Sequence, residues 1–198
     1  MKKLTAIIIS IFFVYTGFSQ GLFRVQAGPV FNYLKAEGDG SYVKVHVGYT
    51  LGVGYEMIAS THFSVQPEFN FIHLKTNESV TNSDIKFDYV QIPVLLKGVT
   101  SSRNFSVYAG PQIGFLTKSS LENGGNTSNI KDDLTQTDFS GVLGFEYIFP
   151  LNITLNARFT QGFSNVYKAE FDSPNTTRHQ YLTVTVGYVF AKKKHTTG

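Results

Sequence analysis

Apolar and polar residues alternate at every second position along most of this chain. In the longest run, residues 44 to 57, seven apolar side chains alternate with seven positions that are polar or glycine. A period of two is the repeat of a β-strand, in which successive side chains point to opposite faces. The pattern recurs and predicts eight strands, at about residues 22–34, 44–57, 62–74, 85–99, 105–115, 139–147, 153–163 and 180–190.

The fourth of these segments departs from strict alternation. Its apolar residues change parity close to residue 89, with Phe87 and Tyr89 on one parity and Val90 and Ile92 on the other. One extra residue in the strand, a β-bulge, would restore a single apolar face. We therefore predict a bulge at residues 88 to 90.

The connections between the predicted strands are alternately short and long. Short turns are expected at residues 58–61, 100–104 and 149–151, and long polar loops at residues 35–43, 75–84, 118–137 and 164–179. If the first strand starts in the periplasm, all short turns lie on the periplasmic side and all long loops face outward. This arrangement is typical of outer-membrane barrels.

Alternation alone also fits a soluble sandwich or a ligand-binding barrel, so the class depends on which face is outside. The polar face carries too many charges for an apolar ligand cavity. These charged positions are Arg24, Lys44, His46, Glu56, Glu68, Lys97, Glu146 and Arg158. With the apolar face toward lipid, the strands are long enough for a tilted membrane span, and a closed barrel pairs every backbone group. The sequence thus predicts an all-β fold, an eight-stranded antiparallel up-and-down transmembrane β-barrel of the outer-membrane type.

The charges of the polar face would then lie in the lumen. We expect Arg24, Glu68, Lys97, Glu146 and Arg158 to form a polar network that fills it. The alternative is that these side chains line a narrow path for small solutes. An eight-stranded barrel has an interior that side chains just fill, so we expect weak or no porin activity.

Aromatic residues fall in two groups on the apolar face, which is typical of girdles at the two membrane interfaces. Near the short turns lie Phe23, Tyr55, Phe63, Phe105, Tyr147, Phe149, Tyr188 and Phe190, and near the long loops Tyr33, Phe71, Phe87, Phe115, Phe139 and Phe163. A simpler interpretation is that aromatic residues favour strands wherever they lie.

The first residues have the form of a secretory signal peptide. Lys2 and Lys3 precede an apolar run of about 15 residues, too short for a membrane helix, and small residues surround Ser19. We expect residues 1–19 to be cleaved, residues 20–191 to form the barrel, and residues 192–198 to form a short basic tail. The destination is the bacterial outer membrane.

Composition excludes several other classes of function. The 17 basic side chains, less the two lysines of residues 1–19, exceed the 14 acidic ones by one, so no nucleic-acid partner is expected. The chain has no cysteine, and its five histidines lack metal-ligand spacing, so we expect no metal and no cofactor.

One pair of residues raises the question of lipid hydrolysis. His62 and Ser64 are close in sequence, and a serine and a histidine are the core of many hydrolases. Their parity places both on the lumen side at the periplasmic end, where they would not reach lipid. We therefore expect a protein that is not an enzyme.

Several short motifs resemble one family of membrane barrels. They are Val65-Gln66-Pro67-Glu68, the run from Tyr89 to Lys97, the run from Tyr108 to Phe115, Gly144-Phe145-Glu146-Tyr147, and the closing run from Val186 to Phe190. In order and spacing they resemble the small PorT-like outer-membrane β-barrel proteins of Bacteroidetes. The resemblance implies an outer-membrane location and eight strands, whereas members of the family have diverse roles. It also implies that Phe190 is the terminal aromatic that assists assembly.

The function that these features favour is a non-enzymatic, monomeric barrel in contact with outer-membrane lipid and lipopolysaccharide. Its loops, above all residues 118–137, would contact an envelope or surface protein, or the barrel would support envelope integrity. A narrow porin is the second hypothesis. A component of an envelope export machine is the third, and only the family resemblance suggests it.

Overall fold

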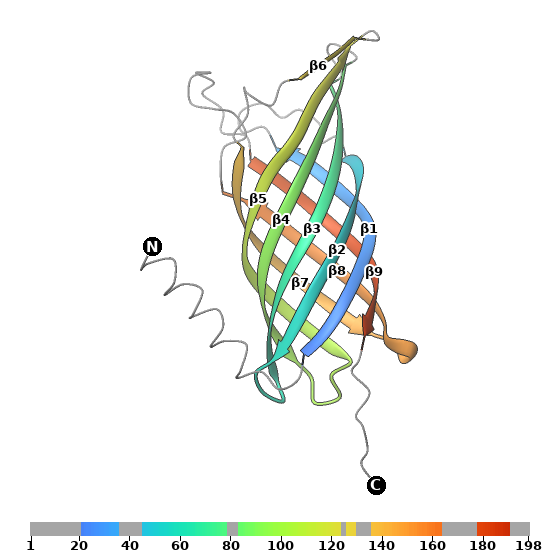
Figure 1. Cartoon of the computed structure of the whole chain (residues 1–198), viewed down its shortest axis with the longest axis vertical. Helices are drawn as coiled ribbons and strands as arrows, with labels where there is room; N and C mark the ends of the chain where they lie inside the picture. The colour runs from blue at the N-terminus through green and yellow to red at the C-terminus, as the bar shows by residue number, and fades with distance from the viewer. Residues whose placement is uncertain are drawn as a thin grey trace, which may run out of the picture.

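Nine strands and one short 3-10 turn make up the described part of the chain. The computed structural model describes residues 21–35, 45–78, 83–123, 126–129, 136–163 and 178–190 (Figure 1). The elements are β1 (Gly21–Lys35), β2 (Val45–Ile58), β3 (Phe63–Glu78), β4 (Ser83–Val99), β5 (Phe105–Asn123), β6 (Asn126–Asn129), β7 (Thr137–Ile148), η2 (Pro150–Asn152), β8 (Ile153–Gly162) and β9 (Arg178–Phe190). No helix within these residues is long and apolar enough to cross a membrane.

Eight of the strands close into a ring. Sequential neighbours pair antiparallel, β5 pairs with β7, β4 pairs with β5, and β9 returns to pair with β1. Each ring strand therefore has a partner on both sides, which is how a barrel satisfies its backbone groups in lipid. The predicted eight-stranded antiparallel barrel is confirmed.

The two ends of the barrel differ. The short connections after β2, β4 and β7 lie at one end, here named the short-turn end, together with the start of β1 and the end of β9 (Figure 1). At the opposite end, the loop end, β3, β4 and β5 rise above the rest of the ring and β6 pairs with β5. In outer-membrane barrels the short turns are periplasmic.

Two of the predicted loops are wrong in their bounds. Strands β3 and β4 pair as far as Glu78 and Ser83, so only residues 79–82 remain of the predicted loop 75–84. Strand β5 continues to residue 123, and β6 occupies part of the predicted loop 118–137. Backbone pairing continues into segments where apolar and polar residues no longer alternate, so the sequence pattern does not mark them as strands. The predicted loops 35–43 and 164–179 lie almost wholly outside the described residues.

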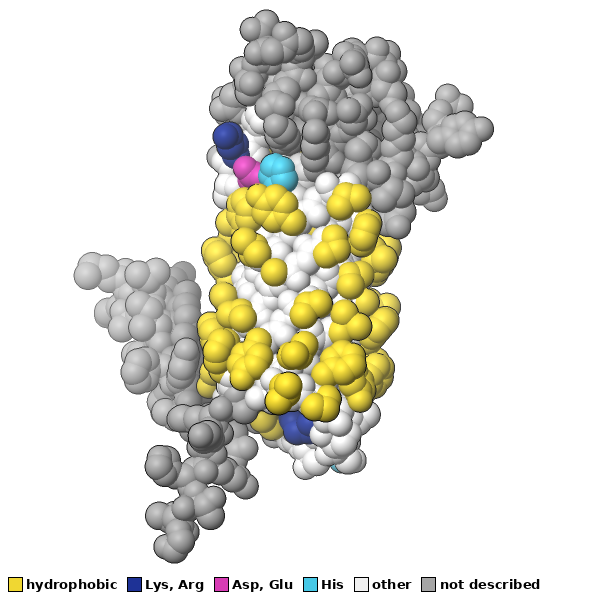
Figure 2. Space-filling view, turned by 90° about the vertical axis from the view of Figure 1, so that its right-hand side faces the viewer, with side chains coloured by type: hydrophobic (Ala, Val, Ile, Leu, Met, Phe, Trp, Pro, Cys, Tyr) yellow, Lys and Arg dark blue, Asp and Glu magenta, His cyan; other side chains and the backbone are white. Residues whose placement is uncertain are grey.

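Apolar side chains face outward along the ring and polar ones face the lumen. On β2 the outward residues Val47, Leu51 and Val53 are each more than 40% exposed, whereas Thr50 and Glu56, which have the opposite parity, are buried. The space-filling view shows hydrophobic side chains as a broad belt across the face of the barrel that is turned to the viewer (Figure 2). The orientation predicted from the charges of the polar face is therefore the one observed.

The bulge predicted in β4 is wrong. Strand β4 pairs with β3 in one unbroken register, and Phe87 and Tyr89 face the lumen while Ile92 faces outward. The irregularity lies in β5: Asp88 pairs with Lys118 but Tyr89 pairs with Leu116, which leaves Thr117 as the extra residue. The sequence interpretation failed because it assumed that every apolar residue faces lipid.

The lumen is in fact apolar toward the loop end. A buried cluster there consists of Val30, Ile72, Leu74, Phe87, Tyr89, Leu116 and Tyr181. Phe87 therefore does not belong to the outer aromatic girdle, where the sequence placed it. The apolar cluster lies inside the barrel because eight strands bring opposite walls within contact of large side chains.

The other aromatic residues follow the two predicted groups. At the short-turn end Phe23 packs on Phe190, with ring centroids 5.7 Å apart, and Tyr147 packs on Phe149 at 4.7 Å. At the loop end Phe115 and Phe139 are exposed on the outer surface. The side chain of Tyr33 lies outside the described ones.

A closed barrel predicts a characteristic gel behaviour. In dodecyl sulfate at room temperature the refolded protein should keep its ring of hydrogen bonds and migrate as a compact form, and boiling should shift it to a slower band. The chain has no tryptophan whose fluorescence could report folding, so the gel shift also serves as the folding assay for variants of the protein. A single band that does not move on boiling would contradict a folded barrel.

Candidate functional site

Charged side chains from most of the ring meet in the lumen near the short-turn end. They occupy inward positions of their strands, because alternation sends every second side chain toward the axis. The ionised members are Arg24 of β1, Glu56 of β2, Glu68 of β3, Lys97 of β4, Glu146 of β7, Arg158 of β8 and, from the turn before β5, Arg103. We name this set the lumen network.

Glu56 is the most connected anion of the lumen network. Its carboxylate accepts from Arg24 Nη2 at 2.5 Å, from Lys97 Nζ at 3.1 Å, from Arg103 Nη2 at 2.9 Å and from the hydroxyl of Ser64 at 2.8 Å. With three cations around it, this buried carboxylate is fully compensated, as a charge out of water requires.

Glu146 joins the same group from the other side of the lumen. Arg24 Nη1 donates to one of its oxygens, and Lys97 Nζ donates to the other at 2.7 Å. Lys97 also donates to Gln66 Oε1 at 3.0 Å, so all three of its donors are used. Strands β1 and β4 are thereby tied to β7, which pairs with neither of them.

A second group surrounds Glu68. Arg158 Nη2 lies 2.9 Å from its carboxylate, and the amides of Gln66, Asn70 and Gln26 donate to it at 2.6, 2.9 and 3.2 Å. Gln66 links the two groups, because it donates to Glu68 and accepts from Lys97. The pair Arg158–Glu68 joins β8 to β3, on opposite sides of the ring.

Tyr108 supports Arg158 from the wall of β5. The guanidinium carbon lies 5.4 Å from the centre of the Tyr108 ring, a cation–π distance, and Arg158 Nε donates to the phenol oxygen at 3.3 Å. The phenol in turn donates to Asn156 Oδ1 at 2.6 Å. Arg158 therefore has partners on both its edge and its face.

Glycines on the inward face make room for these side chains. A Cβ added at Gly54 would lie 3.1 Å from side-chain carbons of both Arg24 and Glu68, and one at Gly144 would lie 2.5 Å from the phenol oxygen of Tyr108. A larger residue at either position would displace a member of the lumen network or its support.

Above the lumen network the interior is mostly uncharged, with the buried Asp138 as an exception, and it then becomes apolar. Tyr181 exchanges hydrogen bonds with Gln91 and accepts one from Gln112 at 2.9 Å. A cavity of about 10 Å³ lies at this level, next to Arg158 and Thr160, which is room for about one water. The apolar cluster follows toward the loop end. A charged layer, a mostly uncharged polar layer and an apolar layer thus fill the described lumen in turn.

The structure brings together all five residues that the sequence singled out: Arg24, Glu68, Lys97, Glu146 and Arg158. Sequence reasoning placed Glu56 on the polar face but not at the centre of the network. Arg103 was missed, because it lies in a turn with a φ of 57° and no periodic pattern marks it. The side chains of Lys44 and His46 lie outside the described ones.

The predicted position of His62 is wrong. It lies in the turn before β3, is exposed, and forms a hydrogen bond of 3.1 Å with Ser101. Alternation does not extend into a turn, so strand parity gave no guide there. Ser64 is buried in the lumen as expected and donates to Glu56. Within the described residues, no group of three His, Asp or Glu side chains is placed to hold a metal ion.

A closed ring with an apolar exterior and a charged lumen defines a bacterial outer-membrane β-barrel. Residues 10–168 match the family described as outer membrane protein beta-barrel domain. The chain belongs to this family. No curated protein matches the chain significantly.

Solved structures agree with the fold. The attachment invasion locus protein Ail of Yersinia pestis is similar with a TM-score of 0.56 and 18% identity, over 86% of this chain and 99% of that one. Neisserial surface protein A is similar with a TM-score of 0.57 and 15% identity, over 85% of this chain and 97% of that one. At these identities the likeness shows the fold.

Removing one partner of the cross-lumen pair tests the lumen network. We expect Arg158→Met to lower the free energy of unfolding by about 3 kcal/mol, because it leaves a buried carboxylate without its cation. Adding Glu68→Gln to the same chain should recover most of this loss, since the amide keeps the shape and the acceptor but not the charge. Urea midpoints from the gel shift measure both effects.

Arg103→Met is the matched control. Its side chain is 28% exposed, so the loss should be at most about 1 kcal/mol. Equal losses for Arg103→Met and Arg158→Met, or no recovery with Glu68→Gln, would contradict the assigned role of the buried pair.

Proposed function

We propose that this protein is a non-enzymatic outer-membrane barrel with a filled lumen, which presents its loop end for surface interaction and supports the envelope. The observation that carries the proposal is that ion pairs join opposite walls of the barrel. Arg158 of β8 meets Glu68 of β3 on the opposite side of the ring, and Arg24 of β1 meets Glu146 of β7 across the lumen. Lys97 of β4 adds a contact to Glu146 past the intervening strand β5. Because these ion pairs fill the lumen and connect its walls, we propose that the barrel acts as a membrane scaffold and not as a channel.

Energetics argue against a narrow porin. A solute path past the lumen network would require four cations and three carboxylates, most of them buried, to exchange partners. Leaving one such charge unpaired costs several kcal/mol. The apolar cluster then presents a second barrier toward the loop end, because ions do not cross a dry apolar constriction readily.

The loop end supports a role in surface interaction. Strands β3, β4 and β5 extend past the apolar belt, and β6 adds to β5 at their tip (Figure 1). Paired strands hold an exposed surface in place at less entropic cost than a free loop. Ail, which is named for attachment and was crystallised with the heparin analogue sucrose octasulfate, has the same type of barrel. We propose an envelope or surface protein as the partner here, and a monomeric barrel.

The non-enzymatic part of the proposal rests on Ser64. Its hydroxyl donates to Glu56 and is fully buried in the lumen, whereas His62 lies outside the lumen and bonds to Ser101. A serine nucleophile needs a base within hydrogen-bond reach and access to substrate. Ser64 has a carboxylate already engaged by three cations and no access to lipid.

We also propose how the protein is exported and to which group of barrels it is related. We propose that residues 1–19 are a signal peptide removed after Ser19, which agrees with the start of β1 at Gly21. We further propose that the chain is PorT-like and comes from the Bacteroidetes, as its motifs suggest. Three of the five motifs, residues 65–68, 144–147 and 186–190, lie next to the short-turn end of the ring, near the lumen network.

Conductance tests the filled lumen. In planar bilayers we expect no steady ion conductance from the refolded barrel. A chain with Lys97→Ala and Glu146→Ala should show more frequent openings, because the contacts of both Arg24 and Lys97 with Glu146 are lost. The gel shift of the same samples checks folding. A steady conductance of the unaltered protein that lumen substitutions change in size would favour the porin hypothesis.

Hydrolysis tests the absence of enzyme activity. The refolded barrel should release no labelled fatty acid from phospholipid or lipid A, and Ser64→Ala should behave identically. Turnover by the unaltered protein that Ser64→Ala abolishes would overturn the proposal.

A further inference from the structure

Two groups of hydrogen-bonded side chains meet in the middle of the lumen. The Glu68 group consists of Glu68 and the side chains that donate to it, among them Gln26 and Arg158. The Tyr181 group lies toward the loop end and consists of Tyr181, Gln91 and Gln112, joined by hydrogen bonds of 2.8 to 3.1 Å. Among the described residues, no side-chain hydrogen bond connects the Glu68 group to the Tyr181 group.

The cavity of about 10 Å³ lies between these two groups. Gln26 and Arg158 border it from the Glu68 group, and Gln112 and Tyr181 border it from the Tyr181 group. Ile72 is the one apolar residue of its lining. Cavities that stay empty in proteins are apolar, whereas polar cavities of this size hold water. The lining of this cavity therefore favours a small polar occupant.

Two threonine hydroxyls at the cavity need a partner. Thr160 and Thr183 both border the cavity and are buried, and the hydroxyl of neither forms a hydrogen bond. Thr160 is the register partner of Tyr181, but their two hydroxyls do not meet the geometry of a hydrogen bond. A buried hydroxyl without a partner destabilises a fold, and such groups are rare in proteins. A molecule in the cavity would satisfy both hydroxyls.

We propose that this cavity binds one structural water molecule, which is hydrogen-bonded to Thr160 and Thr183 and joins the Glu68 group to the Tyr181 group. A water molecule can form up to four hydrogen bonds, and a buried water commonly forms about three. Its remaining bonds go to the polar side chains that border the cavity. The polar contents of the lumen then form one connected network, from Glu146 near the short-turn end to Tyr181.

Charge and size make water the occupant. The guanidinium of Arg158 borders the cavity and repels a cation. Glu68 already balances the charge of Arg158 at 2.9 Å, so an anion at this place would be buried without compensation. A halide ion is also larger than a water molecule. Water adds no charge and can both donate and accept.

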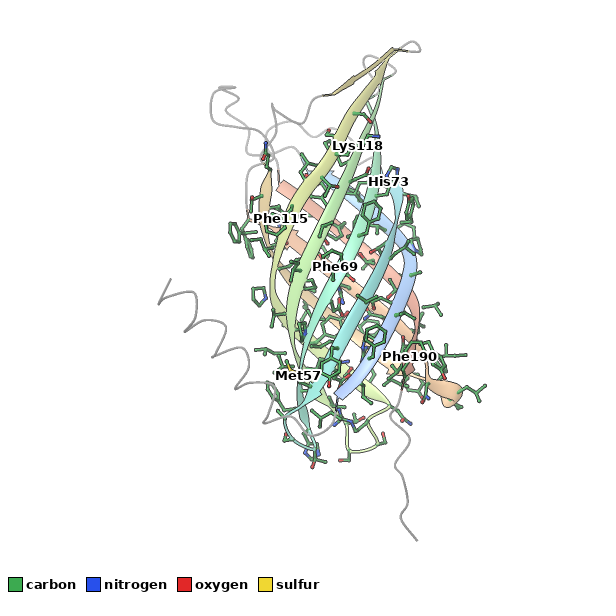
Figure 3. The ribbon with its side chains drawn as sticks, in the orientation of Figure 1. Met57, Phe69, His73, Phe115, Lys118 and Phe190 are labelled. Carbon is green, nitrogen blue, oxygen red and sulfur yellow. The ribbon has the colours of Figure 1, made fainter. Side chains whose placement is uncertain are left out.

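The water would be enclosed from both ends of the barrel. Arg158 of the lumen network borders the cavity on one side, and Ile72 and Tyr181 of the apolar cluster border it on the other. Figure 3 shows the full height of the barrel, with Met57 and Phe190 toward the short-turn end and His73 and Lys118 toward the loop end. The water can therefore leave only when the charged or the apolar layer opens.

A crystal structure of the refolded barrel, at a resolution that orders buried waters, tests the site directly. We expect one water peak in the cavity, within about 3 Å of the hydroxyl oxygens of Thr160 and Thr183. A chain with Thr160→Val and Thr183→Val should lose this peak, because the two hydroxyls that hold the water are removed. No peak in the cavity of the unaltered protein would overturn the proposal.

Thr50→Val is the matched control. Thr50 borders the same cavity, but its hydroxyl already donates to the backbone oxygen of Phe71 at 3.0 Å. This variant should keep the water peak, and loss of the peak would contradict Thr160 and Thr183 as the partners of the water. Crystals grown in bromide should show no anomalous signal in the cavity. A bromide peak there would identify an anion site and contradict the assignment of water.

Stability provides a second readout, because a bonded and an unpaired hydroxyl predict different results. If Thr183 binds water, Thr183→Val removes a hydrogen bond and should lower the folding equilibrium constant about fivefold at a fixed urea concentration. If the hydroxyl has no partner, the same change removes an unpaired buried group, and the urea midpoint should stay equal or rise. An equal or higher midpoint would therefore count against the water site. Valine favours strands, and the gel shift verifies that the variant folds.

These measurements are independent of the proposed function. A cavity without water would leave the ion pairs across the lumen unchanged. That result would contradict the water site but not the filled lumen, which the conductance experiment addresses.

Discussion

Closure of the sheet is the constraint on which the rest of this structure depends. In a bilayer each backbone amide and carbonyl must find a partner within the chain, and β1 meeting β9 removes the last open edges of the ring. Closure with eight strands also sets the interior: it is so narrow that inward side chains from opposite walls touch. The filled lumen is thus a consequence of the strand number.

In the narrow lumen, charged residues connect the walls of the barrel to one another. A single arginine or glutamate facing this interior would be costly, yet seven ionised groups compensate one another with additional amide and hydroxyl donors. Glu56 and Glu146 hold the group near the short-turn end, and Gln66 connects it to the pair Arg158–Glu68. Toward the loop end, where Phe87 and Tyr89 face inward, apolar packing takes over the same space. Electrostatic and apolar packing therefore occupy different depths of one lumen.

The outer wall follows different physics, since its solvent changes from hydrocarbon to head groups within a few residues. Along β3, Phe69 and Phe71 face lipid, His73 lies at the boundary and position 75 is a lysine. Along β3 the residues therefore change from apolar to polar in the same order as the parts of a lipid, from acyl chain to head group.

Much of the architecture could be predicted from the chain alone. The alternating segments predict the number of strands, the outward apolar face and five of the lumen residues. These residues are Arg24, Glu68, Lys97, Glu146 and Arg158. The face to which a side chain points depends only on whether it lies an even or an odd number of positions from its neighbours in the strand. The limits of this reasoning appear where parity has no meaning. Parity placed the side chain of His62 in the lumen, although His62 lies in the turn before β3. Parity also could not identify Arg103, because this residue lies in a turn.

Other features were decided only by the tertiary structure. Parity says that Phe87 and Ile92 face opposite sides, but not that the loop half of the lumen is apolar, and the sequence interpretation therefore introduced a bulge in β4 where the extra residue is Thr117 of β5. Which cation meets which carboxylate depends on the register around the whole ring. The sequence determined the two faces of the barrel, because alternation is local; only closure determined the partners across the lumen, because those contacts join strands far apart in the chain.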